Sequence, residues 1–179
     1  MKPVSEMSVG ELAAYVCSRL AEQGINTVLS GGACVSIYSD NRYQSKDLDF
    51  IENISSGRRK LTAALSALGF TPTKERYFVH PESEFFLEFP PGPLAIGSEP
   101  AGQPATLEFD TGTLRILSPT DCVKDRLAAF FYWNDRQALE QALWVATTHP
   151  VDLQELERWS IKEGETEKFK TFMAALGTR

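Results

Sequence analysis

The order of the secondary-structure signals constrains the fold of this chain more than any other feature. Up to Leu117, short β-branched or aromatic stretches alternate with stretches of helical periodicity. Ser118 and Pro119 then form a helix start, and every later signal is helical. Mixed strands and helices followed by a purely helical region are typical of an α+β protein. We therefore predict a mixed sheet flanked by helices in residues 1–117 and a C-terminal helical segment, residues 118–179, packed on it.

Capping residues, glycines and hydrophobic periodicity mark where the predicted helices and strands begin and end. Helices are predicted at 9–23, 33–39, 57–68 and from 118 onward. Alternation predicts strands at 25–30, 47–53, 76–80, 84–89, 106–110 and 113–117, and the proline- and glycine-rich residues 90–104 predict a loop. Asn134 with Gln137, and Asp152 with Glu155, repeat the N-capping pattern, and a last helix carries Phe169 and Phe172.

Composition excludes several classes of function. The net charge of −6 makes broad binding of duplex DNA through its phosphates unfavourable. The three cysteines show no C-x-x-C spacing, which is typical of buried thiols in a reducing compartment. The N-terminus lacks a signal-peptide pattern and no apolar run is long enough to cross a bilayer. We expect a cytoplasmic protein without a membrane partner.

A pair of aspartates in the second predicted strand is the strongest chemical signal. Asp47 and Asp49 share one face of the strand, about 6.6 Å apart between Cα atoms, while Leu48 and Phe50 point to the other face. Carboxylates at this spacing repel each other unless a cation lies between them. Magnesium prefers such hard oxygen ligands and commonly bridges them to substrate phosphates. The pair therefore predicts a site for one or two Mg²⁺ ions.

Two consecutive glycines end the strand that precedes the aspartates. Gly31 and Gly32 lack side chains, so the backbone at this turn can approach a phosphate closely. In the loop that leads to the aspartates, Ser45 and Lys46 are further candidates for phosphate contact, the lysine as a point charge. Glycines and carboxylates together predict a cradle for a metal-bound polyphosphate.

This combination resembles the nucleotidyltransferase superfamily related to DNA polymerase beta. Within it, the segment that runs from GGACV to DLDF is similar to the minimal nucleotidyltransferases and to the AbiEii-type toxins of abortive-infection systems. The residues that carry the likeness are Gly31, Gly32, Arg42, Ser45, Asp47 and Asp49. The helical segment is similar as well, with Arg126 or Lys124 as its basic residue and Asp135 as its aspartate, although those toxins usually have lysine where Arg126 stands.

The resemblance implies transfer of a nucleoside monophosphate from a nucleoside triphosphate (NTP) to an acceptor hydroxyl, with two Mg²⁺ ions. A third carboxylate should join Asp47 and Asp49 in catalysis and metal binding. Glu88 is the first candidate because a carboxylate among phenylalanines is costly to bury without an ion or a hydrogen-bond partner, and Glu108 and Asp110 are the alternatives. The predicted nucleotide-binding residues are Gly31, Gly32, Ser45, Lys46 and Arg126.

Several readings of the function stay open at this level. The acceptor could be RNA, a protein side chain or a small molecule, and the protein could belong to a toxin–antitoxin pair with a cognate partner. Alternatively, the fold could serve as a catalytically inactive interaction module of the antitoxin kind. A third reading is a transferase of the antibiotic-resistance kind, for which a deep apolar pocket is expected beside the carboxylates.

Overall fold

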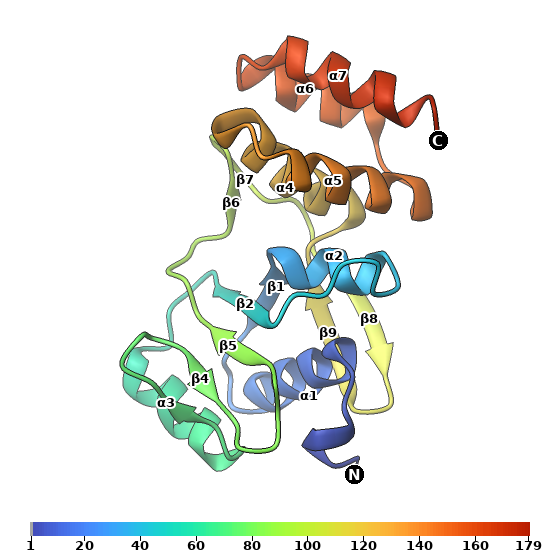
Figure 1. The fold of residues 1–179 in the computed structure, drawn as a ribbon. Helices are drawn as coiled ribbons and strands as arrows, with labels where there is room; N and C mark the ends of the chain where they lie inside the picture. Colours follow the sequence, from blue (N-terminus) through green and yellow to red (C-terminus); the bar gives the residue numbers. More distant parts are fainter. Residues whose placement is uncertain (1) are drawn as a thin grey trace.

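The computed structural model describes residues 2–179 and has the predicted α+β architecture (Figure 1). The strands are β1 (Thr27–Ser30), β2 (Asp47–Glu52), β3 (Thr71–Pro72), β4 (Phe78–Val79), β5 (Phe86–Glu88), β6 (Ala95–Ile96), β7 (Glu99–Pro100), β8 (Ala105–Phe109) and β9 (Gly112–Ile116). Seven of them form one mixed sheet in the order β3-β4-β5-β2-β1-β9-β8, and β6 pairs with β7. Six of the strands match predicted ones: β1, β2, β4 and β5 are shorter than predicted, and β8 and β9 have the predicted length but begin one residue earlier. The two-residue strands β3, β6 and β7 were not predicted.

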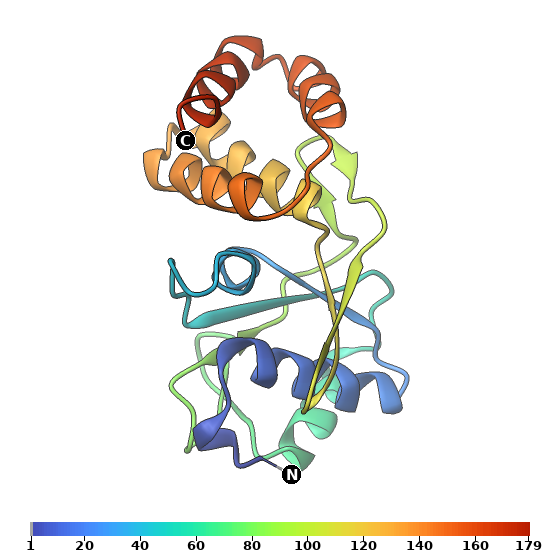
Figure 2. The ribbon, with the colours of Figure 1, turned by 90° about the vertical axis from the view of Figure 1, so that its right-hand side faces the viewer.

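A short 3-10 helix, Val4–Glu6, precedes the α-helices. These are α1 (Val9–Glu22), α2 (Gly32–Tyr38), α3 (Arg58–Ala67), α4 (Pro119–Trp133), α5 (Arg136–Thr148), α6 (Leu153–Lys162) and α7 (Thr166–Leu176). Figure 2 shows α1 below the strands, α2 just above them, and α4 to α7 stacked above α2. None of the helices within residues 2–179 combines the length and the apolar character that crossing a bilayer would require.

The first helix forms as its sequence predicts. Ser8 accepts a hydrogen bond from the Glu11 backbone N–H, and the Glu11 side chain accepts one from the Ser8 N–H, which completes a capping box. Leu12, Val16 and Leu20 lie on one face of α1 and are fully buried in the core beneath the sheet. Hydrophobic periodicity therefore decides which side of α1 packs on the strands.

The start of α5 differs from the prediction. Asn134 does not cap this helix; it adopts a left-handed conformation, with φ of 52°, and ends α4 instead. Asp135 is the N-cap, and its side chain accepts a hydrogen bond of 3.0 Å from the Ala138 N–H. Both residues suit a cap in isolation, and the tight turn between the packed helices α4 and α5 decides which of them takes the role.

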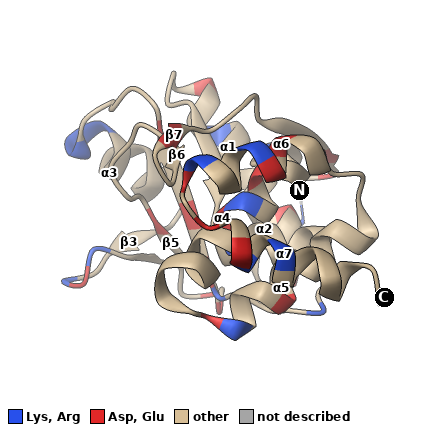
Figure 3. Ribbon diagram, turned by 90° about the horizontal axis from the view of Figure 1, so that it is seen from above, with Lys and Arg blue, Asp and Glu red and all other residues tan. Residues whose placement is uncertain are grey.

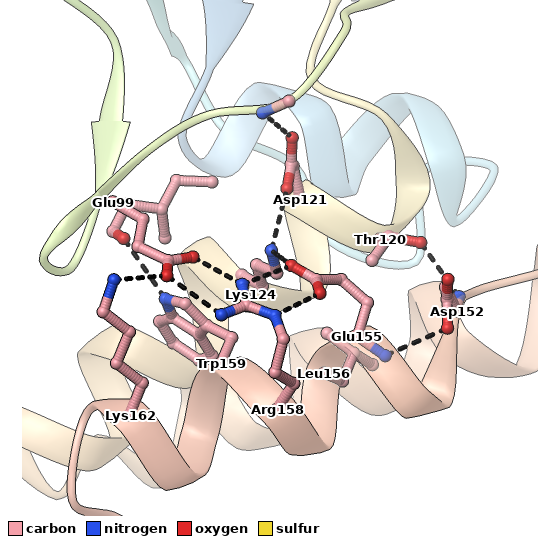
Figure 4. A network of polar contacts seen from close by, with 12 residues as sticks. Glu99, Thr120, Asp121, Lys124, Asp152, Glu155, Leu156, Arg158, Trp159 and Lys162 are labelled. Atoms are coloured by element: carbon pink, nitrogen blue, oxygen red, sulfur yellow. Dashed lines mark hydrogen bonds and ion pairs between the residues drawn. The ribbon is translucent and has the colours of Figure 1, made fainter.

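Residues 90–104, predicted as a loop, contain the small β6–β7 hairpin. Contacts with α6 hold it in place (Figure 4). The indole Nε1 of Trp159 donates to the Ile96 carbonyl at 3.3 Å, and Glu99 pairs with Arg158 and Lys162, each at 2.6 Å. Because these partners lie some sixty positions downstream, no local pattern in this proline-rich stretch could predict the hairpin.

The division between residues 1–117 and residues 118–179 stays a prediction, and side-chain contacts join the two parts. The Thr148 hydroxyl of α5 donates to the Tyr38 carbonyl of α2 at 3.1 Å, and Nε2 of His149, the residue after α5, lies 2.8 Å from the same carbonyl. Seen from above, acidic and basic residues are interspersed over α4 to α7 rather than gathered into one basic face (Figure 3). The helical segment is therefore anchored on α2, directly above the strands.

Acid should loosen the contact between the hairpin and α6. Hydrogen bonds from Arg158 and Lys162 lower the pKa of Glu99 from 4.5 to about 2. A carboxyl with a depressed pKa in the folded state binds protons more readily once unfolded, so its stabilising effect is complete above pH 4.5 and is lost as pH falls toward about 2. We expect the free energy of unfolding, measured by urea titration, to fall in this window, and to fall less in Glu99→Gln. Glu157→Gln, on the exposed side of α6, should follow the wild type.

Candidate active site

Three carboxylates lie together where β2 meets β5. The two strands are parallel, and their register places Asp49 opposite Glu88 and Leu48 opposite Leu87. Asp47, Asp49 and Glu88 are partly exposed on one face of the sheet, whereas Leu48 and Leu87 are fully buried on the other. Strand alternation therefore places the two aspartates on one face, and the pairing of β2 with β5 brings Glu88 beside them.

The two alternatives to Glu88 lie elsewhere. Glu108 is on the edge strand β8, separated from β2 by β9 and β1, and accepts a hydrogen bond of 2.8 Å from Thr113. Asp110 is in the turn between β8 and β9. Glu88 is not on an edge strand, because β5 lies between β4 and β2. Of the three candidates, Glu88 alone is in register with Asp49.

The double-glycine turn directly adjoins the carboxylates. β1 runs antiparallel to β2 with Ser30 opposite Asp49, and the Ser30 hydroxyl donates to the Asp49 carbonyl at 3.2 Å. Gly31 has a φ of +70°, and a Cβ at this position would overlap Oδ2 of Asp49. A Cβ at Gly32 would lie 3.1 Å from the Tyr43 ring. The structure thus brings the bare backbone and the Asp49 carboxylate into contact, as the cradle hypothesis requires.

Gly31→Ala tests this close approach. Alanine disfavours the left-handed backbone of Gly31, and its methyl group would displace the Asp49 carboxylate. We expect the free energy of unfolding to fall by about 1–3 kcal/mol. Calorimetry should detect the loss, and Gly164→Ala provides a control, because that glycine has a φ of +79° but nothing within 4 Å of its added Cβ. A cost at Gly31 no larger than that at Gly164 would show that the Asp49 side chain moves away freely.

Electrostatics at the site favour a bound cation. Burial, together with the charges of Glu88, Asp47 and Asp125, raises the pKa of Asp49 from 3.8 to about 6. Carboxylate oxygens grouped in this way are a chemically suitable donor set for Mg²⁺. Within the described residues, no three His, Cys, Asp or Glu side chains are already drawn together around one metal position. Metal binding by Asp47, Asp49 and Glu88 therefore stays a prediction.

The predicted phosphate contacts of the loop before β2 have different surroundings. Ser45 is buried; its N–H donates to Ser36 Oγ at 2.9 Å and its hydroxyl donates to the Asp47 carbonyl at 3.0 Å. These bonds position the backbone of Asp47. Lys46 is largely exposed and pairs with Glu84 at 3.1 Å, an ion pair that solvent weakens. Lys46 can therefore turn toward a ligand at little cost, whereas Ser45 is held by the fold.

Arg126 is the basic residue of α4 whose charge reaches the site. It lowers the pKa of Asp49, against the larger effects that raise it. The Arg126 guanidinium is mostly buried and donates to Asp125 at 3.0 Å and to Gln141 at 3.3 Å. Lys124, the other candidate, pairs with Glu155 at 2.6 Å and Asp121 at 3.6 Å (Figure 4). Lys124 thus belongs to the network that joins α4 to α6.

Two residues near the site have no motif signal in the sequence. Asp125 of α4 raises the pKa of Asp49 by its charge. Tyr77 precedes β4, and the charge of Glu88, followed by burial and the charge of Asp47, raises the pKa of its hydroxyl. In the sequence, Asp125 is notable only as the neighbour of Arg126, and Tyr77 only as part of a short aromatic stretch. Neither feature indicates that the residue lies near Asp49.

Comparison with known proteins gives a structural likeness. No protein-family model and no curated protein sequence matches the chain. The solution structure of the antibiotic-resistance factor ANT(2'')-Ia is similar with a TM-score of 0.50 and 17% identity, over 95% of both chains. The crystal structure of ANT(2'')-Ia in complex with adenylyl-2''-tobramycin is similar with a TM-score of 0.50 and 16% identity, over 96% of this chain and 97% of that chain. The chain therefore has a nucleotidyltransferase-like fold, which it shares with ANT(2'')-Ia over nearly its whole length.

Proposed function

We propose that the protein is a metal-dependent nucleotidyltransferase that moves a nucleoside monophosphate from an NTP to an acceptor hydroxyl. The observation that carries this proposal is the position of Asp49, which touches the Gly31 backbone on one side and is in register with Glu88 on the other. The shared fold supports it, because ANT(2'')-Ia forms a complex with adenylyl-2''-tobramycin, a molecule that carries an adenylyl group.

Each predicted residue then has a role. Asp47, Asp49 and Glu88 would hold Mg²⁺, which supplies neutralisation of charge on the transferring phosphorus. The backbone of Gly31 and Gly32 would lie along the triphosphate. Lys46, released from Glu84, and Arg126 would offset phosphate charge, and Ser45 would keep Asp47 in place.

The transfer step balances with these groups. The acceptor oxygen forms a bond to the α-phosphorus while the bond from this phosphorus to the oxygen bridging the β-phosphate breaks. Pyrophosphate leaves with that electron pair. The proton of the acceptor hydroxyl passes to a carboxylate, for which Glu88 is our candidate because it lies on β5, on the side of β2 away from β1 and its glycines. Positioning and electrostatics therefore supply most of the rate enhancement.

A transfer assay tests the proposal. The purified protein would be incubated with each α-labelled NTP, Mg²⁺ and a cell extract, in parallel with the Asp47→Ala/Asp49→Ala variant. We expect a labelled product with the wild type only, and a circular dichroism spectrum that the substitutions leave unchanged. Equal labelling by both proteins would assign the activity to the extract and contradict the proposal.

The second candidate function is a catalytically inactive interaction module of the antitoxin kind. The observation that favours it is the engagement of both basic residues of α4 by internal partners, Arg126 with Asp125 and Lys124 with Glu155. Equilibrium binding of Mg²⁺-ATP separates the two functions, because the enzyme should bind it through Asp47 and Asp49 and the module should not. A toxin–antitoxin role, in either case, predicts that expression of this chain changes growth and that a cognate partner reverses the change.

A further inference from the structure

A cavity of about 340 Å³ lies next to the candidate active site but is separate from its carboxylates. It is bounded by the N-terminal segment 2–11, by Ser36 of α2, by the loop before β2 and by the residues that precede β5. The described residues of its walls do not include Asp47, Asp49 or Glu88. Its volume lies within the range of about 300–1,000 Å³ that small-molecule sites occupy. The cavity is therefore a second candidate site, which the proposed function leaves unused.

Hydrogen bonds hold in place the wall that α2 and the following loop form. Ser36 and Ser45 both line the cavity and are buried, and Ser36 Oγ accepts a hydrogen bond of 2.9 Å from the Ser45 N–H. The Asn41 N–H donates to the Ser36 carbonyl at 2.8 Å. These two bonds tie the loop between α2 and β2 to α2. Because this wall is already ordered, little conformational entropy should be lost there when a ligand binds.

Three side chains of the walls have hydrogen-bonding groups available for a ligand. The side chains of Ser5, Asn41 and Gln44 form no hydrogen bond within residues 2–179. Lys2 differs, because its ammonium group donates to the Glu11 carboxylate at 2.7 Å. A hydroxyl and a carboxamide each offer both a donor and an acceptor. The available groups therefore suit a ligand whose own groups both donate and accept, as alcohol hydroxyls do.

The charged groups of the cavity disfavour an anionic ligand. Glu6 forms no ion pair in the described part of the chain, and Lys2, the only cation among the described lining residues, is neutralised by Glu11. Glu84 pairs with Lys46, and it would become a further free carboxylate if Lys46 turned to a triphosphate as proposed above. The walls repel phosphate in both cases. Glu6 and Glu84 are exposed, so solvent also weakens their attraction for a cation.

Apolar side chains complete the walls. Met7, Val9 and the half-buried Phe85 line the cavity. A hollow of about 200 Å³ shares Val9 and Asn41 with it and extends to Phe109. Apolar groups of this kind can cover the C–H surface of a ring while the amides bind its hydroxyl groups. The site thus combines the two kinds of contact that an uncharged, hydroxylated ring requires.

We propose that this cavity binds an uncharged, polyhydroxylated small molecule, such as a sugar or a cyclic polyol, through the Asn41 and Gln44 amides and the Ser5 hydroxyl. The proposal does not rest on nucleotidyl transfer, because the walls lack the carboxylates that would bind Mg²⁺. Ser45 connects the two sites: it lines the cavity, and its hydroxyl donates to the Asp47 carbonyl at 3.0 Å. A bound molecule would therefore lie against the segment that positions Asp47.

A titration followed by NMR tests this site without Mg²⁺ or NTP. Glucose, trehalose and myo-inositol would each be added to the full chain, with inorganic phosphate and spermidine as anionic and cationic probes. We expect saturable changes in the backbone amide shifts of residues 5–9 and 41–45 with at least one of the three polyols, and with neither charged probe. Asn41→Gly, which suits the left-handed backbone there (φ of 61°), and Gln44→Ala should each raise the Kd about fivefold. Gln103→Ala removes an exposed amide outside the cavity and should leave the Kd unchanged.

Each of the other outcomes contradicts the proposal. Failure of all three polyols to shift these amides, saturable binding of phosphate or spermidine in their place, or equal Kd values for Gln44→Ala and Gln103→Ala would overturn it. Polyol-dependent shifts centred on Asp49 and Glu88 would place the ligand at the carboxylates and overturn it as well. Because the titration involves no transfer, a negative transfer assay leaves this site intact, and absence of polyol binding leaves the transferase proposal intact.

Discussion

Asp49→Asn is expected to lower the rate of nucleotidyl transfer by about 10³-fold or more, a loss of roughly 4 kcal/mol of transition-state stabilisation. Asparagine keeps the shape of the side chain between Gly31 and Glu88 but removes the negative charge that would bind Mg²⁺. We do not expect the substitution to destabilise the folded state, because burial and neighbouring carboxylates already destabilise the charged form of Asp49 and raise its pKa to about 6. The free energy of unfolding near neutral pH is therefore expected to stay level or rise.

The rate of nucleotidyl transfer and the free energy of unfolding should be measured on the same preparation, so that a loss of activity can be told apart from unfolding. Asp110→Asn, in the turn between β8 and β9, is the matched control and should change the rate by about twofold or less, since Asp110 lies outside the carboxylate group. A variant Asp49→Asn that retains a tenth of the wild-type rate would contradict the role of Asp49 as a metal ligand. A loss of rate that accompanies unfolding would contradict the electrostatic account of the site.

Trp159→Ala is expected to lower the free energy of unfolding by about 3–5 kcal/mol, the range for removal of a large buried aromatic side chain. Trp159 is fully buried, and its ring stacks on Phe131 of α4 with centroids 5.5 Å apart. Its indole N–H also donates to the Ile96 carbonyl of the β6–β7 hairpin (Figure 4). One side chain thus joins α6, α4 and the hairpin, so its removal leaves a cavity and an unpaired carbonyl together.

Two further variants separate these causes. Trp159→Phe retains much of the packing against Phe131 but loses the hydrogen bond, so it should cost about 1–3 kcal/mol. Trp133→Ala is the control, because the side chain of Trp133 is 82% exposed at the end of α4, and a change within about 0.5 kcal/mol is expected. Urea denaturation of the three variants provides the comparison. A cost for Trp159→Ala as small as that for Trp133→Ala would show that α6 folds independently of the hairpin.

The sequence by itself determined those features of the protein that depend only on residues close together in the chain. The alternation of Asp47, Leu48, Asp49 and Phe50 separates acidic from buried positions wherever the strand lies, and the structure shows that separation. The capping box of Ser8 and Glu11 starts α1 for the same reason, since all its partners lie within one helical turn.

Partners far apart in sequence were decided only by the tertiary structure. The sequence ranked Glu88 first but left Glu108 and Asp110 as alternatives, and only the pairing of β2 with β5 places Glu88 next to Asp49. The same pairing, continued into β4, makes Tyr77 part of the site, and the burial of Trp159 forms a hairpin in a stretch predicted as a loop. The physical reason is that strand register and burial depend on free energy summed over distant segments, which no window of adjacent residues contains.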